Sequence, residues 1–311
     1  DNIVYNCNSG IYHYRYATNS SYYNNDLFFN SIAFEIGDVS GSASSHGLTD
    51  LITIKNNRCI NNLQDIIMES QVVYTGFNIT GNEFFQRDTA TVQEQFNLKH
   101  GILEFNNNKI TNYSTGICAT FYAAEIGEHV EFNDNVFASK VESATPDFIV
   151  FTGNIGGPIG RGLLAIDGLV IDILDGVSSY NRRLRIREPS TKGTKISDIN
   201  FKNCYISLNS GVGDISLDGG SISTQGTDFP LSISVATLAT VSMITVSDIQ
   251  FPKFGSTHAT STSIVAGAGW IVYNNCTTKE NKDISDRANG SQIQSNDCYK
   301  ITAGSLTVSN P

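Results

Sequence analysis

One short phrase returns along the chain and sets narrow limits on its fold. It contains two apolar residues separated by one position, an asparagine three residues later, and a further apolar residue two positions after that. The asparagines of five consecutive matches are Asn57, Asn82, Asn108, Asn135 and Asn154, at spacings of 25, 26, 27 and 19 residues, and the one miss is Gly156 in the last apolar position of the fifth phrase. A unit of this length cannot bury its own apolar face, so such units stack on one another and share a continuous core. The phrase therefore predicts a solenoid.

The pattern inside one unit identifies the kind of solenoid. In the first match Ile52 and Ile54 precede Asn57, and Cys59 follows it. Apolar and polar residues alternate with the two-residue period of a β-strand that has one buried face. Gly, Asn and Asp supply the turn because they tolerate left-handed backbone geometry. We therefore expect an all-β parallel β-helix whose stacked asparagines form an internal hydrogen-bonded ladder.

The repeat continues with drift over the rest of the chain. It is clearest over residues 50–156 and 196–298, and the asparagine position of the later phrases is assigned to Cys204, Gly220, Ile249 and Cys276. Coils of about 24 residues at a rise of about 4.8 Å predict roughly 13 coils in a rod about 60 Å long. We expect one domain over 1–311, and the start in mid-repeat suggests a segment of a longer chain.

Composition limits the partners. Charged residues make up only 16% of the chain and the net charge is −10, which argues against nucleic acid or an anionic membrane surface as the main partner. The absence of an 18-residue apolar run argues against membrane insertion. Cys/His metal spacing is also absent, so we expect no metal and no cofactor. The six cysteines are expected to be free, buried thiols.

Two carboxylates are the strongest candidates for catalysis. Glu104 and Glu131 occupy the same outward position of consecutive phrases, four residues before Asn108 and Asn135. Their backbones should stack about 5 Å apart. Two carboxylates that close do not both ionise easily, and a protonated acid beside an ionised carboxylate is what glycoside hydrolysis requires. The alternative is a solvated pair on an exposed face. A neighbouring column, formed by Arg58, Glu83, Lys109 and Val136, alternates in sign and indicates a structural charge ladder.

Aromatic residues gather near the start of the chain. A strand would place Tyr12, Tyr14 and Tyr16 on one face. Tyrosine rings offer apolar faces with polar edges, which suit sugar rings and protein interfaces equally. These tyrosines are candidate substrate-binding residues, with a subunit interface or a core role as the alternatives.

A basic run is the second candidate binding feature. Arg183 and Arg185 lie in a stretch with four arginines between positions 182 and 187. Guanidinium groups bind carboxylate and phosphate bidentately, so the run could contact acidic sugars or phosphate. A solvated loop is the alternative.

The sequence resembles the right-handed β-helix of bacteriophage tailspikes and tail appendages. The resemblance rests on coils at residues 105–108, 201–204 and 217–220, which read Phe-Asn-Asn-Asn, Phe-Lys-Asn-Cys and Leu-Asp-Gly-Gly. It covers most of residues 50–298, and the pattern is shared with pectate-lyase-like proteins. It implies a homotrimer in the virion that acts at the bacterial surface and binds surface polysaccharide, which many members cleave with carboxylates.

Three functions therefore stay open at the level of sequence. The first is a glycoside hydrolase that acts on O-antigen, capsule or wall polymer, with Glu104 and Glu131 as acid and as base or nucleophile. The second is a non-catalytic adhesin that holds the same glycan through tyrosine and arginine. The third is a polysaccharide lyase or a teichoic-acid-cleaving enzyme, which would need a metal site that the sequence does not reveal.

Overall fold

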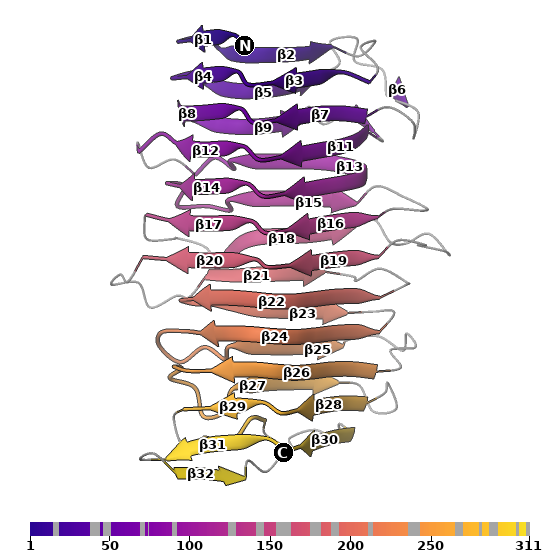
Figure 1. The fold of residues 1–311 in the computed structure, drawn as a ribbon, viewed down its shortest axis with the longest axis vertical. Helices are drawn as coiled ribbons and strands as arrows, with labels where there is room; N and C mark the ends of the chain where they lie inside the picture. Colours follow the sequence, from indigo (N-terminus) through magenta and orange to yellow (C-terminus); the bar gives the residue numbers. More distant parts are fainter. Residues whose placement is uncertain are drawn as a thin grey trace.

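The protein is a stack of β-strand coils (Figure 1). The computed structural model describes residues 1–14, 19–37, 44–45, 51–68, 72–73, 75–88, 92–123, 129–140, 146–153, 163–174, 182–187, 193–210, 214–235, 243–264, 270–279, 282–285, 292–302 and 305–308. Successive coils descend from the N-terminus at one end to the C-terminus at the other. Nearly all neighbouring strands pair in parallel, so the predicted parallel β-helix is confirmed.

Each coil contributes to three faces. Face 1 contains β3 (Ser21–Tyr23), β7 (Leu51–Lys55), β11 (Thr75–Thr80), β16 (Val130–Asn133), β19 (Leu164–Asp167), β28 (Trp270–Asn274) and β30 (Gln292–Asn296). Face 2 contains β1 (Ile3–Tyr5), β4 (Asp26–Phe28), β8 (Arg58–Asn62), β12 (Glu83–Gln86), β14 (Lys109–Asn112), β17 (Val136–Ser139), β20 (Val170–Ile173), β29 (Thr277–Thr278) and β31 (Tyr299–Thr302). Face 3 contains β2 (Ser9–Tyr14), β5 (Ile32–Gly37), β9 (Gln64–Met68), β15 (Ala119–Ala123), β18 (Asp147–Gly153), β21 (Arg182–Arg187), β23 (Cys204–Ser210), β25 (Leu231–Val235) and β27 (Thr260–Ile264).

Several strands connect or end these faces. Three long strands run from face 1 into face 2, namely β22 (Thr194–Lys202), β24 (Ile215–Ser223) and β26 (Met243–Phe251), and β13 (Phe96–Asn106) runs from face 3 into face 1. β32 (Ser305–Val308) pairs antiparallel with β31. β6 (Ser44–Ser45) and β10 (Val72–Val73) form a separate small sheet. The described strands cross face 2 twelve times, one fewer than the roughly 13 coils predicted.

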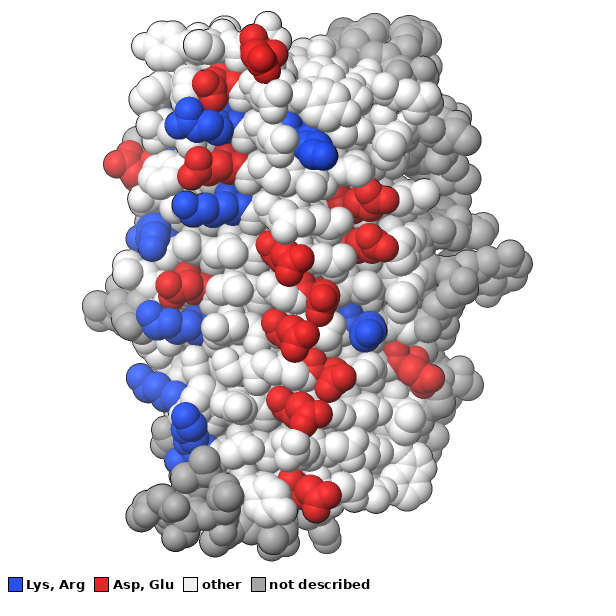
Figure 2. Space-filling view, viewed as in Figure 1, with Lys and Arg blue, Asp and Glu red and all other residues white. Residues whose placement is uncertain are grey.

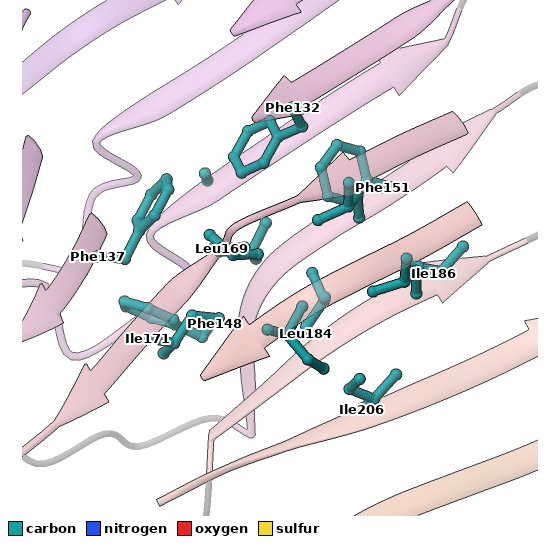
Figure 3. Close-up of a cluster of buried hydrophobic side chains, with 14 of the residues drawn as sticks. Phe132, Phe137, Phe148, Phe151, Leu169, Ile171, Leu184, Ile186 and Ile206 are labelled. Carbon is teal, nitrogen blue, oxygen red and sulfur yellow. The ribbon is translucent and has the colours of Figure 1, made fainter. Parts of the chain in front are cut away.

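The core is a column of apolar side chains that point inward from all three faces. In β16 the burial alternates strictly, with Phe132 buried between two half-buried neighbours. Phe105 and Phe132 stack with ring centroids 4.9 Å apart on consecutive coils. Figure 3 shows the same packing lower in the stack, where Phe132, Phe137 and Phe151 approach Leu169 and Leu184 from different strands. The two-residue alternation in the sequence therefore predicts correctly which side chains are buried.

An asparagine ladder lies inside the turn between faces 1 and 2. Each Oδ1 accepts hydrogen bonds from the backbone N–H and from Nδ2 of the asparagine one coil earlier, at 2.9–3.1 Å. The other Nδ2 hydrogen is donated to a carbonyl of the preceding coil, as in Asn82 to Ile54 at 2.9 Å. The predicted ladder is confirmed, and it extends further towards the N-terminus than predicted. Its members are Asn2, Asn25, Asn57, Asn82, Asn108 and Asn135.

The residue before the ladder position has left-handed backbone geometry in eleven consecutive coils. Its φ lies between +49° and +76°, and it is always Asn, Asp or Gly. These residues adopt that geometry at the lowest steric cost, so the turn chemistry is repeated even where the ladder is not. The residues are Asn24, Asn56, Gly81, Asn107, Asp134, Gly168, Asp198, Gly219, Asp248, Asn275 and Asp297.

Two predicted repeat assignments are wrong. Asn154 lies outside the described residues, but Ile149 and Phe151, which were aligned with it, lie in β18 on face 3 and pair with β15. The residue that follows Asn135 in the ladder position is Leu169, 34 residues later (169 − 135). Cys204 begins β23 on face 3, and the ladder position of its coil is Ile199, which pairs with Gly220.

The cysteines are free thiols, and five of them are buried as predicted. Cys7 is exposed, which corrects the expectation for that residue. It lies in the first coil, where another coil does not cover it in the described structure.

Candidate functional site

Glu104 and Glu131 lie directly opposite each other on consecutive coils of face 1. Glu104 is in β13 and Glu131 is in β16, and the two residues pair in register. Both carboxylates point outward because their neighbours Leu103, Phe105 and Phe132 fill the core. The predicted stacking is therefore confirmed, whereas Val150, which lies four residues before Asn154, is on face 3. The column continues instead with Ala165.

This arrangement differs from the rest of the described surface. Glu104 and Glu131 are the only like charges that lie directly opposite each other in the registers of the described strands. On face 2 the signs alternate, as predicted: Glu83 lies between Arg58 and Lys109, with N···O distances of 3.9 and 3.6 Å. The Glu pair therefore departs from the alternation of opposite charges that stabilises neighbouring strands.

The acidic residues at the turn between faces 1 and 2, unlike the Glu pair, do not lie directly opposite one another. They form a zigzag row down the molecule (Figure 2). Aspartates alternate between the last position of the face 1 strand and the left-handed turn position next to it, in the order Asp134, Asp167, Asp198, Asp218, Asp248. Ser, Gly or Asn occupies the position beside each carboxylate, so no two of these aspartates are in register.

Each carboxylate of the Glu pair has a polar partner that was not among the predicted site residues. Asn78 donates from Nδ2 to Glu104 Oε2 at 2.6 Å, one coil earlier in the same column. Nε2 of His129 lies 2.8 Å from Glu131 Oε1. The spacing of two residues between His129, which directly precedes β16, and Glu131 could have indicated this contact, because residues two apart in extended backbone point to the same side.

Arg183 and Arg185 belong to a second cluster, on the outer side of face 3. They lie in β21, a strand rather than the loop considered as the alternative, and alternate with buried Leu184 and Ile186. Asp147 of β18 accepts a hydrogen bond from Arg183 Nε, and Arg185 Nη1 lies 3.2 Å from Asp147 Oδ2. Arg183 Nη1 also lies 3.3 Å from the hydroxyl of Tyr205.

In this cluster the ionised Asp147 carboxylate holds the guanidinium groups of Arg183 and Arg185 in place. Partial burial raises the pKa of the Asp147 carboxyl, but hydrogen bonds and charges from Arg183 and Arg185 outweigh it, so that the pKa lies below its ordinary value. Burial raises the pKa of Tyr205. Nε of Arg185 is buried without a hydrogen-bond partner. The cluster therefore suits binding of an anionic group better than proton transfer.

The fold separates the candidate residues into different regions. Tyr12 is exposed on β2 and lies in the same face 3 column as Arg185, six coils away, or about 29 Å at 4.8 Å per coil. Tyr14 is in β2, but its side chain lies outside the described structure, as does the whole of Tyr16. The Glu pair lies on face 1. The candidate residues therefore do not form one compact site.

The class of this protein is defined by its fold alone. Comparison with protein families, with curated proteins and with solved structures found no match to this chain. Within the described parts of the chain, no helix is long and apolar enough to cross a membrane. No group of three or more His, Cys, Asp or Glu side chains among the described residues could hold a metal ion. The chain is thus assigned to the class of parallel β-helix proteins by its architecture.

Proposed function

We propose that this protein is a tailspike-type receptor-binding protein that recognises and hydrolyses a bacterial surface polysaccharide. The observation that carries the proposal is the in-register pair of Glu104 and Glu131, the one pair of like charges directly opposed in the described strands. Neighbouring like charges destabilise a sheet, so their presence is better explained by chemistry than by stability.

The pair has the components that glycoside hydrolysis needs. One carboxyl group protonates the leaving oxygen, and the other attacks the sugar or activates water. Asn78 and His129 hold the two carboxylates through hydrogen bonds of 2.6 and 2.8 Å, which orients them on the outer side of face 1. Glu104 and Glu131 are thus proposed as acid and as base or nucleophile.

A second candidate function is glycan binding without cleavage, which the cluster on face 3 favours. Asp147 fixes the guanidinium groups of Arg183 and Arg185 through hydrogen bonds. Tyr12 lies in the same column and offers an exposed ring. The anionic groups of an acidic polysaccharide would bind the two guanidinium groups. In this function the Glu pair is surface charge.

A panel of purified bacterial surface polysaccharides separates the two functions. The hydrolase releases oligosaccharides of repeat-unit mass plus one water, whereas a lyase yields unsaturated products without that water. We expect Glu104→Gln and Glu131→Gln each to lower turnover by at least about a hundredfold while glycan binding persists. Glu83→Gln, in the face 2 charge ladder, is the matched control and should keep wild-type turnover. Wild-type turnover in both site variants would refute the assignment of the pair.

Assembly and location are part of the same proposal. A tailspike-type protein would be a homotrimer in the virion and would act at the bacterial cell surface, with no nucleic acid or membrane insertion involved. Light scattering on the purified chain is expected to give a mass three times the monomer value of 33.8 kDa. A monomer that still cleaves its glycan would remove the trimer from the proposal and leave the hydrolase in place.

A further inference from the structure

Two buried cysteines lie opposite each other in the last coils of the stack. Asn274 pairs with Asn296 and Thr277 with Tyr299, which places Cys276 and Cys298 in register between them. The backbone N–H of Tyr299 donates to the Cys276 carbonyl at 2.9 Å. Both side chains point into the core, with exposed fractions of 0% and 1%.

The other buried thiols whose register is described lack such a partner. Cys59 lies opposite Leu27 and Phe84, and Cys204 lies opposite Arg182. Stacked coils are about 4.8 Å apart. This separation falls within the 4.4–6.8 Å between Cα atoms that disulfides span. The pair of Cys276 and Cys298 therefore has the backbone separation that a disulfide requires.

The two thiols also interact with each other. Each thiol lies within hydrogen-bond distance of a backbone carbonyl, Cys276 of Val246 and Asn274 at 3.4 Å and Cys298 of Asn296 at 3.3 Å. The neighbouring Cys276 lowers the pKa of the Cys298 thiol, whereas Cys298 and burial raise that of Cys276. The thiolate is the nucleophile in thiol–disulfide exchange, so the thiol with the lowered pKa is the one that begins the reaction. Cys298 is accordingly the attacking sulfur and Cys276 the resolving one.

We propose that Cys276 and Cys298 form an oxidisable dithiol site, whose disulfide fastens the last parallel coil to the coil before it. A small-molecule disulfide such as oxidised glutathione is the oxidant. The Cys298 thiolate attacks one of its sulfurs and releases one glutathione thiol. Cys276 then loses its proton, attacks Cys298 and releases the second glutathione. The two cysteines are oxidised, and glutathione disulfide is reduced to two thiols.

The disulfide acts on the part of the stack that has the fewest neighbours. β30 and β31 are held to the coil above by pairing with β28 and β29, and below β31 lies only the antiparallel strand β32 in the described structure. A disulfide closes the loop from residue 276 to residue 298 and restricts the opened chain. Local opening of this coil is what admits the oxidant to the buried thiols. Once the disulfide has formed, such opening becomes rarer.

Mass spectrometry of the intact wild-type chain tests the proposal directly. After incubation with oxidised glutathione, with mild denaturant to open the terminal coil, we expect the loss of two hydrogen atoms and a peptide that links Cys276 to Cys298. Amide hydrogen exchange in β30 and β31 should slow by at least about tenfold in the oxidised protein. Cys59→Ser should oxidise like the wild type, and Cys298→Ser should lack the linked peptide.

Three results would overturn the proposal. One is that both thiols stay free while the terminal coil exchanges its amides under the oxidising conditions. Another is glutathione retained on either cysteine without resolution. The third is a disulfide that joins either residue to a different cysteine. The wild-type measurement stands even if Cys298→Ser fails to fold.

Discussion

At the scale of single residues, Asp65 is a carboxyl group fully enclosed by the fold. It lies at the start of β9, and its Oδ2 accepts a hydrogen bond from Gln95 Nε2 at 2.6 Å, whereas Oδ1 has no partner. Burial raises its pKa to about 7, and the hydrogen bond from Gln95 only partly opposes this effect. The folded protein therefore holds a proton on Asp65 that the unfolded chain releases near pH 4.

The sign of the pH effect follows from this difference. Between about pH 4 and pH 7 the unfolded chain ionises Asp65 while the folded chain keeps it neutral, so stability falls as the pH rises. Relative to Asp65→Asn, we expect the wild type to lose on the order of 1 kcal/mol per pH unit in this window. Thermal unfolding midpoints at pH 5, 6 and 7 measure the effect. Asp172→Asn, an exposed control, should keep the wild-type slope, and an unchanged slope in Asp65→Asn would contradict the assignment.

Sequence patterns at this scale predict orientation well and contacts poorly. The alternation places Arg182 inside and Arg183 outside β21 because successive side chains of a strand point to opposite faces. Nothing in the spacing of 36 residues between Asp147 and Arg183 (183 − 147) indicates their contact. That contact depends on how the intervening chain returns to face 3.

At the scale of elements, the turn between faces 1 and 2 repeats because its chemistry is local. Its left-handed position accepts Asn, Asp and Gly in turn. The next residue in β24, Gly220, must be glycine. Its φ is +111°, and an added Cβ would lie 2.0 Å from the Ile199 carbonyl oxygen of the coil above. Backbone atoms cannot give way as a flexible side chain can.

Gly220→Ala is therefore expected to be strongly destabilising. We expect a loss of roughly 3 kcal/mol or more in the free energy of unfolding, from strain at the positive φ and from the close contact with Ile199. Gly81→Asn is the matched control, because Asn occupies the same turn position at Asn56 and Asn107, and it should cost less than about 1 kcal/mol. Urea unfolding followed by circular dichroism compares them, and equal losses in the two variants would argue against the steric explanation.

At the scale of the whole molecule, stability is distributed from coil to coil. Each coil contacts mainly its two neighbours, so a local defect should spread only a short way. Asn108 is buried and links Asn82 to Asn135. Its removal leaves buried donors and acceptors without partners.

Asn108→Ala is expected to lower the free energy of unfolding by about 3 kcal/mol. Hydrogen exchange should accelerate in β11, β14 and β16, on the coils around it, and stay unchanged in β24 and β26. Lys109→Ala, at the exposed neighbouring position, should change stability by less than about 0.5 kcal/mol. Faster exchange over the entire stack would show that the coils unfold as one unit instead.

The sequence by itself determined the strand alternation, the turn residues and the asparagine ladder, because these depend on local backbone geometry repeated at each coil. Alignment by period failed where loops vary in length, at Asn154 and Cys204, because coil register is set by the packing of strands far apart in the chain. Only the tertiary structure decided that Glu104 and Glu131 lie on a different face from Arg183 and Arg185, and that Cys276 opposes Cys298. Such contacts between distant residues arise when the chain returns to the same face, and spacing alone does not encode the length of that return.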